Sequence, residues 1–216
     1  MGTREQILAR IRRRQQRGGA GPSPAEIVDR DTYLRRHPRG SLPELPDDLV
    51  TLFLERAAMS SSTTERVANA REAPAAVARY LDTHRLPKTG CMWPVLSRLD
   101  WQGAGVMLEP RAAHGGDAIG VTGVFCALAE TGTLMVVSGP DTPATVSLLP
   151  ETHVAVVPVE RIVAVMEDGW DLARAEFGQL PRAVNFISGP SRTADIEQTI
   201  VLGAHGPYRV HIVVVG

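Results

Sequence analysis

The spacing of apolar and polar residues along the chain predicts helices and strands that follow one another in turn. Apolar residues at helical spacing indicate amphipathic helices over residues 3–16, 47–57, 73–84 and 167–178. Short apolar runs bounded by turn-forming residues indicate strands at residues 59–67, 91–93, 105–108, 133–137, 153–157, 183–187 and 208–215. Because helices alternate with strands, we expect an α/β fold with a mostly parallel sheet flanked by helices.

The first 46 residues differ in pattern from the remainder of the chain. Residues 18–46 are rich in glycine, proline and charge, and only residues 25–36 favour a short turn of helix. We therefore expect an N-terminal helix and arm over residues 1–46 and an α/β domain over residues 47–216. The basic helix at residues 3–16 is either a solvated helix or a docking element for a partner subunit.

Composition and charge exclude several functional classes. The chain has 23 basic and 24 acidic residues and a net charge of −1, which argues against a nucleic-acid or membrane-surface protein. No apolar run approaches the length of a membrane span, and the N-terminus lacks the apolar core of a secretory signal. We therefore expect a cytoplasmic location.

The two cysteines, Cys91 and Cys126, are far apart and form no metal-binding spacing. This pattern argues against a disulfide framework and against a zinc or iron–sulfur site built by this chain alone, so we expect no cofactor in it. Cys126 lies in an apolar run, which indicates a buried thiol.

The stretch over residues 187–197 has the pattern of an anion-binding turn. It follows the strand at 183–187 and precedes an expected helix at about 194–201, whose free N–H groups and positive end favour an anion. Arg192 adds a fork of donors, and hydroxyls come from Ser188, Ser191 and Thr193. Asp195 is either a favourable acid at the helix start or part of the site.

Two further polar clusters lie at expected strand ends: Glu130-Thr131-Gly132-Thr133 and His205-Gly206-Pro207. Glu130 is either a surface carboxylate at a turn or an acid, base, nucleophile or hydroxyl acceptor. His205 is either a loop acid–base or an anchor for its loop. Since loops at the carboxyl ends of parallel strands commonly form ligand sites, we expect these clusters to converge with the 187–197 turn in one cleft there.

Two histidines lie within strand patterns. We expect His153, at the start of its strand, to be a hydrogen-bonded edge residue, and His211 to face a covered side of the sheet. The motifs GxxxxGK[ST], GxGxxG after a strand, HExxH and GxSxG are absent, which weakens P-loop, dinucleotide, metalloprotease and hydrolase interpretations. Residue chemistry alone therefore predicts an anion site and no particular reaction.

Taken together, these motifs resemble the LUD-domain family, and within it the lactate utilization protein C branch. The resemblance covers roughly residues 50–216 and rests on four motifs, which are Ala129-Glu130-Thr131-Gly132-Thr133-Leu134, Ser147-Leu148-Leu149-Pro150 with His153, Ser188-Gly189-Pro190-Ser191-Arg192-Thr193-Ala194-Asp195-Ile196-Glu197, and Gly203-Ala204-His205-Gly206-Pro207. Family members often carry an arginine shortly before the Ser-Leu-Leu-Pro element, whereas this chain has none at residues 141–146. That difference weakens an anion contact from this loop.

The resemblance implies a Rossmann-like fold similar to the sugar-phosphate isomerase, CoA-transferase and 5-formyltetrahydrofolate cyclo-ligase group. It further implies a component of a bacterial system that oxidises L-lactate to pyruvate, with two companion proteins, one cysteine-rich and one carrying iron–sulfur clusters. The tentative catalytic residues are Glu130 and His205. A small anionic ligand would be bound by Thr131, Gly132, Thr133, Ser188, Gly189, Ser191, Arg192, Thr193, Asp195 and Gly206.

Two alternatives remain open at this stage. One is an independent transferase, isomerase or ligase acting on a phosphorylated or CoA-linked substrate, with Glu130 as nucleophile or base and the Arg192 turn as anchor. The other is a non-catalytic scaffold subunit that docks through its arginine-rich N-terminal helix.

Overall fold

The computed structural model describes residues 3–15, 21–196, 199–203 and 205–216, and for residues 193–202 it describes the backbone. The chain divides into two compact units, Met1–Leu42 and Pro43–Gly216. The first unit holds α1 (Thr3–Arg14) and α2 (Pro24–Arg36), neither of which has a buried residue. Only a short turn was expected over residues 25–36, but Ser23 and Glu26 form a capping box around Pro24 and start a 13-residue helix.

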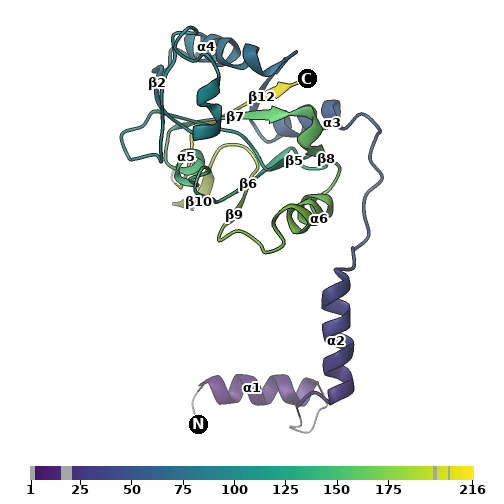
Figure 1. The fold of residues 1–216 in the computed structure, drawn as a ribbon. Helices are drawn as coiled ribbons and strands as arrows, with labels where there is room; N and C mark the ends of the chain where they lie inside the picture. The colour runs from purple at the N-terminus through teal and green to yellow at the C-terminus, as the bar shows by residue number, and fades with distance from the viewer. Residues whose placement is uncertain (1–2, 16–20, 197–198, 204) are drawn as a thin grey trace. The chain divides into compact units, whose positions relative to one another are not determined.

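The second unit is built on a six-stranded parallel sheet among the described residues (Figure 1). In order across the sheet, its strands are β1 (Thr63–Val67), β12 (Arg209–Val215), β7 (Thr152–Pro158), β4 (Ile119–Thr122), β2 (Thr89–Met92) and β3 (Met107–Pro110). Every pairing in it is parallel. The predicted α/β fold with a mostly parallel sheet is confirmed.

A smaller sheet lies beside the parallel one and was not predicted. Its strand order is β8 (Ile162–Val163), β5 (Cys126–Leu128), β6 (Thr133–Val137) and β9 (Val184–Ile187). The β5–β6 and β6–β9 pairings are antiparallel, whereas β5 and β8 run parallel. Its strands lie between β4 and β12 in the chain, on either side of β7. The Glu130–Thr133 motif joins β5 to β6 and the Ser188–Arg192 turn follows β9, whereas His153 lies in β7 of the parallel sheet.

Helices cover these sheets and cap the strand ends. The α-helices of the second unit are α3 (Leu49–Met59), α4 (Ala73–Thr83), α5 (Thr145–Leu148) and α6 (Met166–Phe177). Short 3-10 turns follow the strands at η1 (Ala70–Glu72), η2 (Pro94–Arg98) and η3 (Val159–Arg161). Asp48 starts α3 as expected, because its carboxylate accepts hydrogen bonds from the N–H and hydroxyl of Thr51. The same bonds lower the pKa of Asp48.

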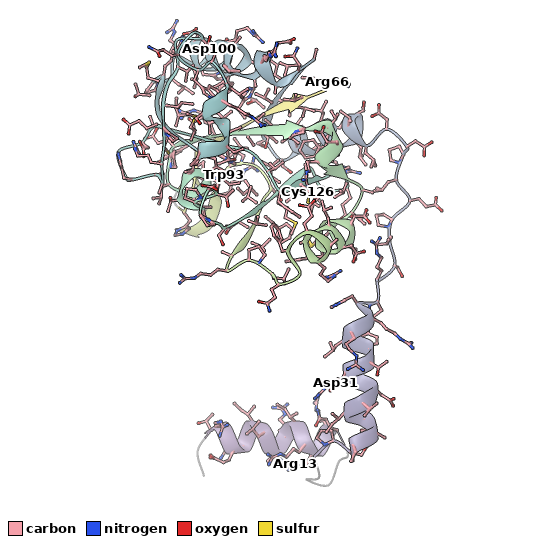
Figure 2. The ribbon with its side chains drawn as sticks, viewed as in Figure 1. Arg13, Asp31, Arg66, Trp93, Asp100 and Cys126 are labelled. Atoms are coloured by element: carbon pink, nitrogen blue, oxygen red, sulfur yellow. The ribbon has the colours of Figure 1, made fainter. Side chains whose placement is uncertain are left out.

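The described residues of the second unit form four apolar clusters, and three of these are layers between its helices and sheets. The first lies between α4 and the parallel sheet, and the second lies between the parallel sheet, α3 and the smaller sheet. The third lies between the smaller sheet and α6, where Gly169 lets the helix approach the side chains of Cys126 and Met135. Figure 2 shows Cys126 within this packing. Cys126 is buried as predicted, and burial raises the pKa of its thiol to about 11.

The expected helix at residues 194–201 is wrong. The backbone there forms an antiparallel ribbon of β10 (Arg192–Ile196) and β11 (Thr199–Leu202), with a register irregularity between Thr193 and Ile196. The acids at 195 and 197 suggested a helix start, but this segment is rich in β-branched residues, which favour strands. Among the described residues, no helix N-terminus therefore follows the Ser188–Arg192 turn.

The two strand histidines are both in the interior. His153 is fully buried in β7, between β12 and β4, and its Nε2 lies 2.8 Å from the Thr122 hydroxyl, so the prediction of an edge residue is wrong. His211 faces a covered side of the sheet as predicted, and the covering element is α4. Its ring stacks on Tyr80 with 3.9 Å between the ring centroids, and its Nδ1 lies 2.9 Å from the Thr63 hydroxyl. Burial lowers the pKa of each histidine to about 4.

Candidate functional site

The predicted Thr131–Thr133 turn and Ser188 meet through their hydroxyls. The Thr131 hydroxyl donates to Thr133 Oγ1 at 2.8 Å, and Thr133 Oγ1 lies 2.6 Å from Ser188 Oγ. The pairing of Leu134 in β6 with Ile187 in β9 sets this contact, because it places the two strand ends side by side. Thr133 is buried, whereas Thr131 and Ser188 are exposed, so the chain of hydroxyls runs from the interior to the surface.

Both motif glycines of these turns pack on the C-terminal end of α3. A Cβ on Gly132 would lie 2.2 Å from the backbone nitrogen of Ala57, and one on Gly189 would lie 1.9 Å from the carbonyl oxygen of Ser60. Both glycines also have positive φ, of 65° and 80°. Only glycine combines that backbone conformation with so close an approach.

Arg192 reaches the same helix end. Its guanidinium donates to the hydroxyl of Ser61, which follows the C-cap residue Ser60 of α3 and has a φ of 64°. A cation beside the last turn of a helix is stabilised by the free carbonyls there. No ion pair between the described residues includes Arg192, so its charge is not neutralised by a described carboxylate.

The His205-Gly206-Pro207 loop joins this group through the backbone. The N–H of Ser191 donates to the Pro207 carbonyl at 2.9 Å, and the N–H of Gly203 donates to the Ser191 carbonyl at 2.9 Å. A Cβ on Gly206 would lie 3.3 Å from Ser191 Cβ, and the neighbouring His205 is exposed. We call Ser61, Thr131, Thr133, Ser188 and Arg192 the hydroxyl–arginine cluster.

The hydroxyl–arginine cluster lies at a different edge of the parallel sheet from the one expected. Ser61 precedes β1 and Pro207 precedes β12, so the cluster borders the amino ends of these strands. The expectation of the carboxyl edge was wrong because the motif loops connect strands of the smaller sheet and the β10–β11 ribbon. The rule for open parallel sheets does not apply to such loops.

Glu130 makes contacts of its own at the start of α6. Its carboxylate accepts a hydrogen bond from the Met166 N–H at 3.2 Å, and its backbone N–H donates to the Ala164 carbonyl at 3.0 Å. A carboxylate at a helix N-terminus is favourable, so these contacts supply a structural role for Glu130. The side chains of Thr193 and Asp195 lie outside the described residues.

Sequence reasoning missed the contribution of α3 to this region. The last residues of α3 and the following Ser60 and Ser61 contact both glycine turns and Arg192. The amphipathic pattern of residues 47–57 indicates a helix, but it carries no signal for what packs at the helix end. The signal that could have pointed there is the Ser/Thr-rich run at 60–64.

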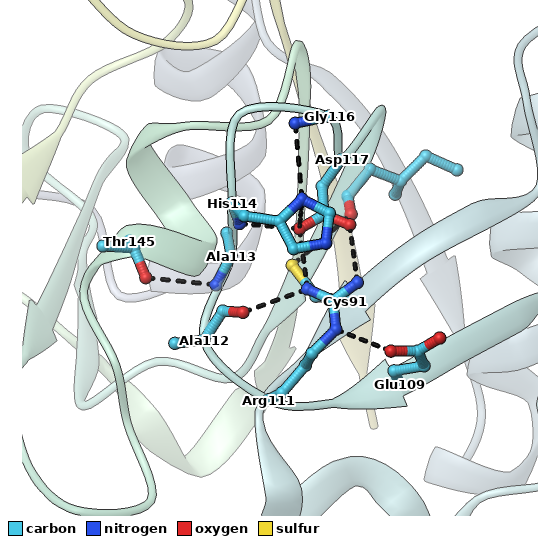
Figure 3. A network of polar contacts seen from close by, with 10 residues as sticks. Cys91, Glu109, Arg111, Ala112, Ala113, His114, Gly116, Asp117 and Thr145 are labelled. Carbon is cyan, nitrogen blue, oxygen red and sulfur yellow. Dashed lines mark hydrogen bonds and ion pairs between the residues drawn. The ribbon is translucent and has the colours of Figure 1, made fainter.

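A second polar network was also missed (Figure 3). Its residues line a cavity of about 420 Å³ at the amino ends of β2 and β3. Arg111 binds both carboxylate oxygens of Asp117, at 2.8 and 2.9 Å, and also binds Glu109 at 2.6 Å. Asp117 is buried and accepts the His114 N–H at 2.8 Å; these bonds, above all that from Arg111, hold its pKa well below its usual range. Because its charges are mutually paired, this network is suited to fixing the loop before β4.

Cys91 lies beside this network in the interior (Figure 3). Burial, together with the negative charge of Asp117, raises the pKa of Cys91 to about 12, which disfavours the reactive thiolate. Among the described residues, no group of three or more His, Cys, Asp and Glu side chains is arranged to hold a metal ion. Within the same residues, no helix combines the length and apolar character needed to cross a membrane.

Comparison with known proteins places these motifs in a family. The family model described as the LUD domain matches residues 97–215, more than half of the chain. Lactate utilization protein C of Bacillus subtilis (strain 168) is 39% identical over 100 residues, which are 45% of this chain and 42% of the relative. Lactate utilization protein C of Halalkalibacterium halodurans is 42% identical over 100 residues, which are 45% and 44% of the two chains. The aligned segment is thus less than half the length of these relatives.

A solved structure supports the same fold. The crystal structure of a DUF162 family protein from Deinococcus radiodurans superposes with a TM-score of 0.60 at 24% identity, over 81% of this chain and all of that one. The family model covers most of the α/β unit, including the Glu130–Thr133 turn, the Ser188–Arg192 turn and the His205–Pro207 loop. The chain therefore belongs to the LUD-domain family.

Proposed function

We propose that the chain is a component of a bacterial L-lactate utilisation system and supports the oxidation of L-lactate to pyruvate. The observation that carries this proposal is an identity of about 40%, over about 100 residues, to several proteins named lactate utilization protein C. Two companion proteins, one cysteine-rich and one with iron–sulfur clusters, would perform the electron transfer. This chain would act with them in the cytoplasm.

Within this proposal, the hydroxyl–arginine cluster binds a small carboxylate. Arg192 supplies a cation whose described contact is to the neutral Ser61 hydroxyl, and Ser188 supplies an exposed hydroxyl. A guanidinium and hydroxyls are donors that match carboxylate oxygens. In this proposal, the exposed His205, on the loop that is hydrogen-bonded to Ser191 through Pro207, exchanges a proton with the bound hydroxy acid.

Growth and reconstitution on L-lactate test the proposal. Deletion of the gene in the native host should abolish growth on L-lactate, and the purified companion proteins should oxidise L-lactate only when this chain is added. An Arg192→Ala variant should weaken lactate use roughly tenfold or more, because a hydrogen bond from a charged donor contributes about 1.5–3 kcal/mol. Arg182→Ala, an exposed arginine outside the cluster, is the matched control.

Two outcomes would contradict this assignment. A companion complex that oxidises L-lactate at the full rate without this chain would remove its role in the system. Full activity in the Arg192→Ala variant would remove the cluster from ligand binding while leaving the system assignment intact. Glu130→Gln distinguishes this proposal from the alternative of an independent transferase, isomerase or ligase. An enzyme that uses Glu130 as its nucleophile would lose all turnover in this variant.

A further inference from the structure

The carboxyl edge of the parallel sheet, opposite the edge that the hydroxyl–arginine cluster borders, holds a cavity of about 330 Å³. Its lining comes from the segments at the ends of five parallel strands. Val156 and Pro158 lie at the end of β7 and Val215 at the end of β12, while η1, η2 and Gly123 directly follow β1, β2 and β4. In open parallel sheets this edge is where ligand sites commonly form, yet the family motifs lie elsewhere.

The lining has a distinctive composition. Its residues are apolar or glycine except for two arginines, Arg98 and Arg161, and none of them is acidic. Such a wall favours a ligand with an apolar body, and the arginines favour one negative group on it. The two arginines of the lining therefore disfavour cations, and its apolar residues disfavour fully polar anions.

The two arginines are held differently. Arg161 pairs with Glu176 at 2.6 Å, and its guanidinium carbon lies 5.8 Å from the centre of the Phe125 ring. Arg98 is exposed at the end of η2, and no ion pair or side-chain hydrogen bond of the described residues includes it. Arg98 is therefore the cation at this cavity that is available to an incoming anion.

We propose that this cavity binds an amphipathic carboxylate, with the apolar body against the ends of β7 and β12 and the carboxylate on Arg98. The site is separate from the hydroxyl–arginine cluster, which borders the amino ends of β1 and β12. The two sites share no lining residue.

Calorimetric titration of the full chain with octanoate tests this site. Octanoate should bind with one-to-one stoichiometry, whereas octanol and octylamine, which have the same body without a negative charge, should bind at least about tenfold more weakly. Arg98→Gln should weaken octanoate binding about tenfold for the same reason. Arg71→Gln is the matched control, because Arg71 is exposed in η1 and does not line the cavity.

A filling variant locates the binding. Ala70→Leu adds a side chain at the wall and should prevent octanoate binding, while Arg192→Ala should leave it unchanged. Circular dichroism establishes that each variant is folded. Absence of octanoate binding to the unmodified chain, equal binding of octanol, or full binding by Ala70→Leu would each overturn the proposal.

Discussion

At the scale of single residues, glycines of two family motifs pack against the C-terminal end of α3. Gly132 and Gly189 both adopt positive φ and approach the α3 backbone more closely than a Cβ permits. Replacement at either position would therefore push against main-chain atoms, which cannot rotate away as a side chain can. These glycines are explained by packing, and their presence in a motif does not by itself assign them to a ligand.

Gly189→Ala is expected to destabilise the protein by about 3 kcal/mol or more, since a left-handed conformation costs about 1–2 kcal/mol and the clash adds to it. Urea unfolding followed by circular dichroism measures the change.

The matched control for this substitution is Gly178→Ala. Gly178 also has a positive φ, of 67°, but open space where a Cβ would lie, so the substitution there has no clash with main-chain atoms. Equal effects of the two substitutions would contradict the close packing of Gly189 on Ser60.

At the scale of elements, neighbouring strands β7 and β12 each bury a histidine. His153 and Val210 are partners in the pairing of β7 with β12, so their side chains lie on the same face of the sheet. His211 follows Val210 in β12 and therefore lies on the opposite face, where it contacts Tyr80 of α4. His153 Nδ1 and His211 Nε2 have no hydrogen-bond partner among the described residues. A neutral ring tolerates this environment better than a charged one, which is why burial lowers both pKa values to about 4.

The stability of the protein should fall as the pH decreases from about 6.5 to 4. In this window the unfolded histidines, with a pKa of about 6.5, bind protons that the folded ones do not. Each buried histidine contributes a slope of about 1.4 kcal/mol per pH unit. His211→Phe keeps an aromatic ring against Tyr80 and should remove one of the two contributions.

Urea unfolding of both proteins at several pH values between 7 and 4 provides the measurement. The stability contributed by the neutral histidine is fully present above pH 6.5 and is lost as the pH falls toward the folded pKa. An unchanged slope in His211→Phe would mean that His211 does not titrate between the folded and unfolded states.

At the scale of the whole molecule, the two units differ in how they are stabilised. The helices of Met1–Leu42 have no buried residue, whereas the three apolar layers of Pro43–Gly216 draw on residues from Leu45 onward. Ile7, Ile11, Val28 and Tyr33 are exposed on the N-terminal helices. The stability of the α/β unit should therefore not depend on the N-terminal segment.

A protein consisting of residues 43–216 is expected to retain the unfolding free energy of the full chain within about 0.5 kcal/mol, because surface changes away from a core have effects of that size. Denaturant unfolding of the two proteins measures the difference. A loss of several kcal/mol would show that residues 1–42 contribute to the core.

Much of the fold could be predicted from the sequence because local spacing reports local geometry. The apolar run at 153–157 and the helical spacing at 73–84 each match an element of the structure, β7 and α4. The segment at 194–201 failed because two local signals conflicted there, the acids favouring a helix start and the β-branched residues favouring strands. The motif residues themselves were identifiable, since unusual polar residues at strand ends stand out from the apolar pattern.

By itself, the sequence determined the alternating elements, the parallel sheet and the motifs that mark the family. Tertiary structure alone decided that Thr133 meets Ser188, that α3 ends against Gly132 and Gly189, and that these groups lie at the amino edge of the sheet. It also paired Arg111 with Asp117 while leaving Arg98 without an ion pair among the described residues. The physical reason is that spacing encodes which face of an element is buried, whereas contacts between distant segments depend on strand pairing and packing.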